Sequence, residues 1–389
     1  MVGQTVKLLF FILAAGSASA QVRFEESTLA TDLKGGYQVI AADLNKDGRP
    51  DLIALASGMK ELYWFENSSW ARHVLVSGLN RMINAAALDT NGDGVPELLV
   101  AHEFANVARN SIGIVSLVES DGDPRRPWKA REIDRIPTAH RLRVMRLRGG
   151  RAIVNAPLTE ASAEPPDYRG IVPLMFYRPP QWKREPVAST VSGVLHGILA
   201  YDWDGDGLDE LLTASFQGLH LFRQDRSGAW RQEQLSGGDP AAWPKSGSSE
   251  IVVGKLGKER FLASIDPWHG NQVSVYRKAG KTWTRQVIDA TEPDGHTLHA
   301  ADLDGDGRDE IIAGYRGQGR SVYYYRADGK DGSWKRHAID RGGIAAAGCA
   351  IADFDADRRL DVACIGSATA NLKLYRNAGS AQRDARTPR

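Results

Sequence analysis

The nine residues DWDGDGLDE at positions 202–210 decide the fold, because close variants of them recur along the chain. The other copies begin at Asp43, Asp89, Asp302 and Asp353, and short apolar segments flank each of them. Oxygen-bearing side chains at positions 1, 3, 5 and 9 are the ligands that a hard divalent cation prefers. Glycine at position 6, present in four of the five copies, allows the sharp turn that points these oxygens inward. The sequence therefore predicts five Ca²⁺-binding loops.

The predicted Ca²⁺ ligands occupy the same four positions in every loop. They are Asp43, Asn45, Asp47 and Asp51; Asp89, Asn91, Asp93 and Glu97; Asp202, Asp204, Asp206 and Glu210; Asp302, Asp304, Asp306 and Glu310; and Asp353, Asp355, Asp357 and Asp361. The last loop has Arg358 at position 6 instead of glycine. An EF-hand is excluded, because position 12 is never Glu and the flanking segments are short apolar runs that predict β-strands rather than helices.

The spacing of the loops predicts the architecture. Two of the four intervals between loop starts are about twice as long as the others, which gives a repeat of roughly 50 residues. Strand pairs without an acidic loop fill the two gaps, at residues 140–154 and 250–263. Six tryptophan-led segments predict outer strands, and residues 24–29 supply a seventh. We therefore predict an all-β, seven-bladed β-propeller in which an N-terminal strand completes the last blade and closes the ring.

The two ends of the chain differ from the repeats. A lysine, an apolar stretch and small residues up to Ala20 predict a signal peptide over residues 1–20, cleaved after Ala20. We expect the propeller over residues 21–377, a disordered tail over residues 378–389, and a secreted or periplasmic protein. The apolar stretch is too short to span a bilayer, so no membrane span is expected.

Composition limits the partners and leaves the cysteines open. Lys plus Arg total 49 and Asp plus Glu total 48, so no basic surface is available to bind nucleic acid. The two cysteines, Cys349 and Cys364, lie on the strands that flank the last acidic loop. In an oxidising compartment they would form a disulfide across the hairpin, and otherwise they are two small buried side chains.

A set of histidines is predicted at one face of the propeller, around its axis. The first strand of a blade lines the central channel, so the residue six positions before the first acidic position lies at the opposite face from the loop. In blade 3, which lacks the acidic loop, Arg146 occupies that first position. The end of the second strand reaches this same face. These two rules select His102, His140, His196, His269, His296, Tyr37 and Arg316. Inheritance from an ancestral repeat would also place histidines there, and the alternative is a site that binds a transition metal such as Zn²⁺ or supplies general bases.

The acidic loops, the blade length and the Trp-x-Arg-His segments at residues 70–73 and 334–337 resemble the FG-GAP/VCBS repeat family. In that family the loops are structural Ca²⁺ sites between the first two strands of a blade. The chain also resembles the propeller part of the aldos-2-ulose dehydratases, which are sugar lyases. This second resemblance implies a carbon–oxygen lyase or dehydratase that acts on a carbohydrate or small sugar by β-elimination next to a carbonyl.

For such an enzyme, His140, His196 and His296 are the expected acid–base residues, with His269, His102 and Tyr37 in support. Arg316 or a metal ion would hold the charge of the enolate. The alternatives are a non-catalytic FG-GAP/VCBS repeat protein that binds a glycan or a protein partner, and a purely structural exported scaffold.

Overall fold

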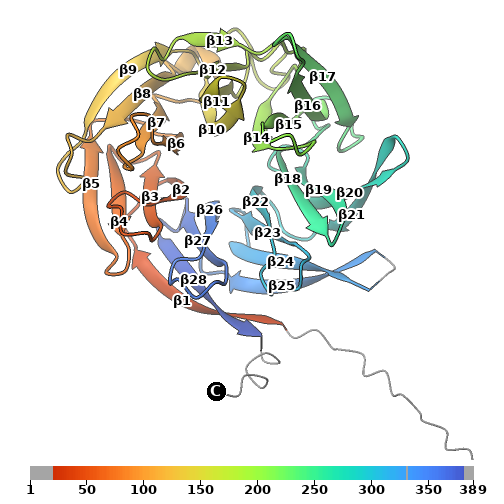
Figure 1. The fold of residues 1–389 in the computed structure, drawn as a ribbon. Helices are drawn as coiled ribbons and strands as arrows, with labels where there is room; N and C mark the ends of the chain where they lie inside the picture. The colour runs from red at the N-terminus through yellow and green to blue at the C-terminus, as the bar shows by residue number, and fades with distance from the viewer. Residues whose placement is uncertain (1–20, 330–331, 381–389) are drawn as a thin grey trace, which may run out of the picture.

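The structure, a computed structural model, describes residues 21–329 and 332–380. In this part of the chain the strands form seven four-stranded antiparallel sheets, which stand around a central axis as the blades of a propeller (Figure 1). The predicted seven-bladed fold is confirmed. The predicted signal peptide lies outside the described residues. Among the described residues, no helix is long and apolar enough to cross a membrane.

Within each blade the strands follow one another from the channel outward. Blade 1 consists of β2 (Gly36–Ala42), β3 (Asp51–Ala56), β4 (Glu61–Glu66) and β5 (Ala71–Ser77); blade 2 of β6 (Asn84–Leu88), β7 (Glu97–His102), β8 (Ile114–Glu119) and β9 (Lys129–Arg135), with a 3₁₀ helix η1 (Ala108–Asn110) before β8; and blade 3 of β10 (Ala139–Leu147), β11 (Gly150–Pro157), β12 (Met175–Tyr177) and β13 (Arg184–Pro186).

Blade 4 consists of β14 (Leu195–Tyr201), β15 (Glu210–Ser215), β16 (Gly218–Gln224) and β17 (Trp230–Ser236); blade 5 of β18 (Glu250–Leu256), β19 (Glu259–Asp266), β20 (Gln272–Ala279) and β21 (Thr282–Asp289); blade 6 of β22 (Gly295–Ala301), β23 (Glu310–Tyr315), β24 (Ser321–Asp328) and β25 (Ser333–Arg341); and blade 7 of β26 (Ala346–Ala352), β27 (Asp361–Gly366), β28 (Leu372–Ser380) and β1 (Val22–Ala30).

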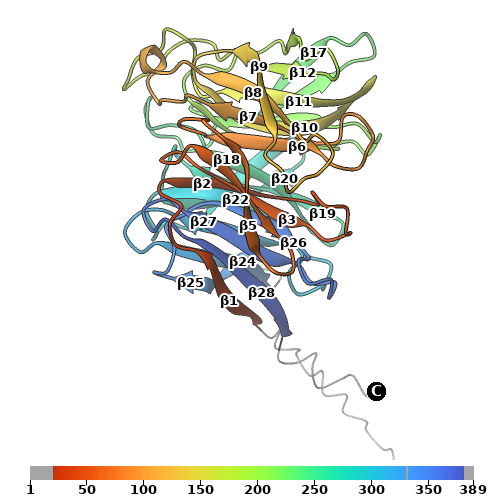
Figure 2. The ribbon, with the colours of Figure 1, turned by 90° about the vertical axis from the view of Figure 1, so that its left-hand side faces the viewer.

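The N-terminal strand closes the ring as predicted, because β1 pairs with β28 as the outer strand of blade 7. Seen from the side, β1 and β28 lie next to each other at one edge of the disc (Figure 2). Strand β28 runs on to Ser380, whose partner is Val22. The predicted tail boundary at residue 378 was therefore wrong by three residues, since β1 provides backbone partners up to that point. Residues 381–389 of the predicted tail are outside the described part.

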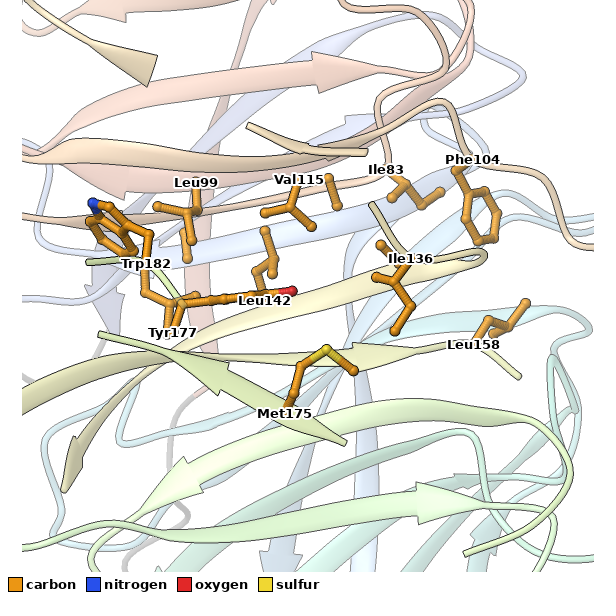
Figure 3. Packing of buried hydrophobic residues seen from close by; sticks show 14 of the residues in the cluster. Ile83, Leu99, Phe104, Val115, Ile136, Leu142, Leu158, Met175, Tyr177 and Trp182 are labelled. Atoms are coloured by element: carbon orange, nitrogen blue, oxygen red, sulfur yellow. The ribbon is translucent and has the colours of Figure 1, made fainter. Parts of the chain in front are cut away.

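The core lies between neighbouring blades, where apolar side chains of one sheet pack on the next. Leu99 and Val115 of blade 2 lie against Leu142, Met175 and Tyr177 of blade 3 (Figure 3). These side chains are at most 2% exposed. Complete burial of one such apolar side chain stabilises the fold by about 1.5–3 kcal/mol. The blades thus form a rigid ring that fixes the positions of the first strands around the channel.

The two cysteines form a disulfide that links β26 to β27. Cys349 and Cys364 lie directly opposite each other in the strand register, which settles the alternative that the sequence left open. A cross-link that closes a loop of this length stabilises a fold by about 3 kcal/mol. It therefore reinforces the blade in which the two ends of the chain meet.

Candidate functional site

The acidic loops share one pattern of hydrogen bonds. In all five, the carboxylate at position 1 accepts the backbone N–H of position 6 at 2.8–3.0 Å. The carboxylate at position 5 accepts the N–H of position 7 at 2.7–2.9 Å. The residue at position 6 has a positive φ, including Arg358 at 69°. The last loop therefore keeps the shape of the others without the glycine.

The carboxylate at position 9 also holds the hairpin together. In each loop it accepts the backbone N–H of position 2 at 2.7–3.0 Å. Asp361 in addition accepts the N–H of Asn377 at 2.7 Å, which ties the loop to β28. Burial raises the pKa of Asp361 to about 6 and that of Glu310 to about 8. Sequence analysis assigned this position only as a metal ligand, so the hydrogen bond is an additional role.

Three of the loops gather their carboxylates closely enough for one cation. The oxygens at positions 1, 3 and 5 lie within 4.8 Å of one another in the loops that begin at Asp202, Asp302 and Asp353. In the Asp302 loop, Arg326 Nη2 lies 2.8 Å from Asp304 Oδ2 and 2.7 Å from Asp306 Oδ2. A positive group thus lies against these oxygens. The donor set suits Ca²⁺, and the Ca²⁺ sites remain a prediction.

At the other end of the channel, four histidines from four blades meet. We call His140, His196, His269 and His296 the histidine cluster. The ring of His196 is central, with its centroid 5.0 Å from that of His140, 4.9 Å from that of His269 and 5.1 Å from that of His296. The first strands β10, β14 and β22 carry three of them, and the loop after β19 carries His269.

The histidine cluster is buried rather than open at the channel mouth. His140, His196 and His296 are each 1% exposed, and only the side chain of His269 reaches 29%. Phe104 stacks on the ring of His140, and Trp268 packs on that of His269. These two aromatic side chains come from loops that cover the ends of the first strands.

The hydrogen bonds of the cluster fix which nitrogens are free. His296 Nδ1 lies 2.5 Å from the carbonyl oxygen of Ala347 and must donate to it, which leaves Nε2 as the nitrogen with a lone pair. That Nε2 is buried without a hydrogen-bond partner. His196 Nδ1 lies 2.9 Å from Glu250 Oε1, and its Nε2 lies 3.3 Å from His269 Nε2.

One nitrogen from each of His196, His269 and His296 lies within 4.8 Å of the others. Metal-binding histidines commonly donate their second nitrogen to a carboxylate or a backbone carbonyl, as His196 and His296 are placed to do here. The three nitrogens suit a transition-metal ion such as Zn²⁺, but Arg141 Nη2 lies 3.3 Å from His196 Nε2 and would have to move away from a bound ion.

Burial keeps the cluster neutral. Burial lowers the pKa of all four imidazoles, and the charge of Arg141 or Arg316 lowers it further in each. Burial alone would raise the pKa of Glu250, but Arg141 and His196 outweigh it and lower that pKa. At neutral pH the site therefore has neutral imidazoles beside an ionised carboxylate.

Two other predicted residues join the cluster. Tyr37 Oη lies 3.0 Å from His140 Nε2, and burial raises the pKa of this phenol. Arg316 Nη2 lies 3.3 Å from His269 Nδ1 and 2.8 Å from Asp294 Oδ1.

His102 is not brought into the cluster. Its Nε2 lies 2.9 Å from Ser116 Oγ, within blade 2. The second strand β7 is one strand further from the axis than β6, so its last side chain contacts β8 instead of the channel.

Sequence analysis missed Arg141 and Glu250. Arg141 Nη2 lies 2.8 Å from Glu250 Oε1 and its Nε donates to the carbonyl of His196 at 2.9 Å. Both residues are nearly buried. One feature of the sequence could have identified them: each is a charged residue in a strand that was expected to line the channel. The two strands belong to the two blades that lack an acidic loop.

Family profiles match two parts of the chain. The FG-GAP-like repeat profile matches residues 43–100 and 302–364. These two segments are similar to FG-GAP-like repeats. The profile described as aldos-2-ulose dehydratase, beta-propeller domain, matches residues 112–279, a segment that includes His140, His196 and His269.

A curated relative and two solved structures are similar to this chain. Aldos-2-ulose dehydratase of Phanerodontia chrysosporium is 26% identical over 309 residues, which cover 71% of this chain and 33% of the relative. The chain thus spans about a third of that protein. A chain of a mitotic checkpoint complex matches with a TM-score of 0.55 at 10% identity, covering 95% of this chain and 99% of its own. A chain of the BBS1N–ARL6DN complex matches with a TM-score of 0.54 at 12% sequence identity. This match covers 90% of this chain and 96% of that chain. These two establish similarity of fold alone.

Proposed function

We propose that this propeller is a carbohydrate-acting lyase or dehydratase, and that the histidine cluster is its reaction centre. The observation that carries the proposal is the convergence of four neutral imidazoles, one tyrosine and one carboxylate at the end of the channel. The similarity to a dehydratase supports the class of reaction.

Elimination next to a carbonyl needs a base, a group that stabilises the enolate, and an acid. The base removes the proton from the carbon α to the carbonyl, and the electron pair forms the enolate. A carbon–carbon double bond then forms as the β carbon–oxygen bond breaks, and the leaving oxygen takes up a proton. Water or an alcohol is released, and no oxidant is required.

The Tyr37–His140 pair is suited to the role of base. The raised pKa of Tyr37 keeps its hydroxyl protonated, and in the His140 tautomer with its proton on Nδ1 that hydroxyl donates to His140 Nε2. As the tyrosine oxygen takes the substrate proton, its own proton passes to His140. A neutral imidazole has the lone pair that accepts this proton, but burial and the charge of Arg141 lower the pKa of His140, so the protonated imidazole must pass the proton on.

The opposite side of the cluster is suited to the roles of acid and enolate stabilisation. In a metal-free site, His196, oriented by Glu250, is the candidate that passes the proton taken up by His140, whose ring centroid is 5.0 Å away, to the leaving oxygen. Arg316 holds His269 through its contact with Nδ1. A Zn²⁺-type ion held by His196, His269 and His296 would supply positive charge to the enolate oxygen.

A cavity beside the cluster has room for a small sugar. It has a volume of about 420 Å³ and is lined by Tyr37, His296 and Glu250, among others. This volume lies in the usual range of small-molecule sites.

Burial of three of the histidines favours a second candidate function. A non-catalytic propeller that binds a glycan or protein on its surface would use these imidazoles only to fill the end of the channel.

Metal content and product formation test the proposal together. Wild type, the His196→Ala/His296→Ala double variant and a His220→Ala control would be analysed for bound metals and incubated with keto-sugars and uronate glycans. His220 is also buried, but in β16, outside the cluster. Loss of a general acid–base group should reduce formation of the unsaturated product by at least about 100-fold in the double variant. Equal product formation in all three proteins, or none with any substrate, would favour the binding module.

A further inference from the structure

The channel beside the histidine cluster carries an unbalanced positive charge. Three of the residues that line it are charged: Arg141, Arg143 and Glu250. Arg141 and Glu250 form an ion pair with a distance of 2.8 Å. No ion pair of the described residues includes Arg143. Its Nη1 donates to two neutral oxygens, Asn84 Oδ1 at 3.1 Å and the carbonyl of Leu142 at 2.8 Å.

The positive charge of Arg143 destabilises the folded protein unless an anion binds next to it. Arg143 is partly buried, and burial together with the charge of Arg141 lowers its pKa to about 10. Removing a cation from water without a partner costs free energy, which a bound carboxylate would offset. A planar guanidinium is well matched to a carboxylate, because it offers two parallel N–H donors.

A second unused donor lies next to Arg143. Asn84 is fully buried, and its Oδ1 accepts hydrogen bonds from Arg143 and from the backbone N–H of Leu142. Its Nδ2 has no hydrogen-bond partner. A buried amide donor left unpaired destabilises the protein, because it has lost its hydrogen bonds to water. The channel wall thus offers donors from two side chains without a matching acceptor.

We propose that Arg143 and Asn84 bind the carboxylate of an acidic sugar, such as a hexuronate, inside the channel. The choice of this substrate class rests on the proposed function. Arg143 follows His140 by three residues in β10, about 10 Å along the strand. Arg143, Tyr37 and His296 line the same cavity, so a hexose ring bound by its carboxylate at Arg143 can extend towards Tyr37 and the histidine cluster. A neutral sugar of the same shape would leave the guanidinium unpaired.

Calorimetric binding of matched sugars tests the proposal. D-galacturonate, D-glucuronate and acetate would be titrated into wild type, with D-galactose as the neutral match. We expect the hexuronates to bind at least about 10-fold more tightly than galactose, a preference that R143Q abolishes and R143K keeps in part. Arg146→Gln is the control, since it removes the same charge from β10 at an exposed position where Arg146 pairs with Asp209. The Arg146→Gln variant should prefer hexuronates over galactose as strongly as wild type does.

Folding and catalysis are separated from binding in the same experiment. R143Q removes an unpaired charge, so its Tm should equal or exceed that of wild type. Titration of the His196→Ala/His296→Ala variant shows whether binding persists without the reaction centre. Arg143-dependent hexuronate binding without any elimination product would support the carboxylate site and count against the proposed reaction. Equal binding of galactose and hexuronates, an unchanged preference in R143Q, or no binding of any acid would overturn the proposal.

Discussion

The acidic loops and the histidine cluster lie at opposite ends of the channel, and they are built in different ways. Each loop is completed within nine consecutive residues, by hydrogen bonds that recur in five blades. The cluster takes one side chain from each of four blades, and its contacts exist only when the ring is assembled. Local repetition thus stabilises one end, whereas long-range assembly creates the chemistry at the other.

The largest expected effect concerns the hydroxyl of Tyr37. Tyr37→Phe keeps the ring that packs against His296 but removes the hydrogen bond to His140. If the pair is the base, kcat should fall by about 10²–10⁴-fold while Tm changes little. Steady-state kinetics and calorimetric melting measure the two effects. A variant with wild-type kcat would remove Tyr37 from the mechanism.

Removal of Ca²⁺ should affect stability but not the cluster. A loop that binds Ca²⁺ only when folded gains about 1.4 kcal/mol at an ion concentration ten times its Kd, so five loops together give several kcal/mol. We expect EGTA to lower the Tm and added Ca²⁺ to restore it, without loss of transition metal. Differential scanning calorimetry with and without EGTA tests this. An unchanged Tm would mean that the hydrogen bonds alone hold the loops.

His220 is buried but lies outside the histidine cluster, so it shows what burial alone does to the pKa of a histidine. Burial lowers the pKa of His220 to about 4, below its value of 6.5 in the unfolded chain. Its contribution to stability is therefore complete above pH 6.5 and is lost as the pH falls towards 4. At pH 5 the loss is about 2 kcal/mol. Urea unfolding of wild type and His220→Gln at pH 7 and pH 5 measures this loss of unfolding free energy. If the unfolding free energies of the two proteins fell equally between pH 7 and pH 5, the prediction would be wrong.

The smallest expected effect concerns position 6 of the loops. Arg358 adopts a φ of 69°, and Gly307 adopts 84° at the equivalent position. Arg358→Gly should stabilise the protein by about 1 kcal/mol, and Gly307→Ala should destabilise it by a similar amount. A Cβ at Gly307 would meet no atom within 4 Å, so the effect there is purely conformational. Chemical denaturation in EGTA compares the two variants with wild type. A destabilised Arg358→Gly variant or a stabilised Gly307→Ala variant would contradict the prediction.

The sequence was sufficient for the fold because the loop repeat fixes the strand order and the blade number. It also placed Tyr37, His140, His196, His269, His296 and Arg316 at one end of the channel by simple counting. It did not predict that Phe104 and Trp268 cover the cluster, since the loops that carry them follow no repeat. The pairing of Arg141 with Glu250 joins blades 3 and 5, and the spacing within a repeat does not encode such contacts.

The pairing of β1 with β28 has a consequence for the time course of synthesis. Ala30, at the end of the first strand, pairs with Leu372 in the last one. A ribosome delivers β1 long before its partner exists, so blade 7 is the last blade to be completed. Until then the nascent chain exposes an unpaired strand at each end of an open arc, and such edges can pair with other chains. Because β1 stays unpaired until β28 has been made, slow or interrupted translation promotes aggregation of this propeller.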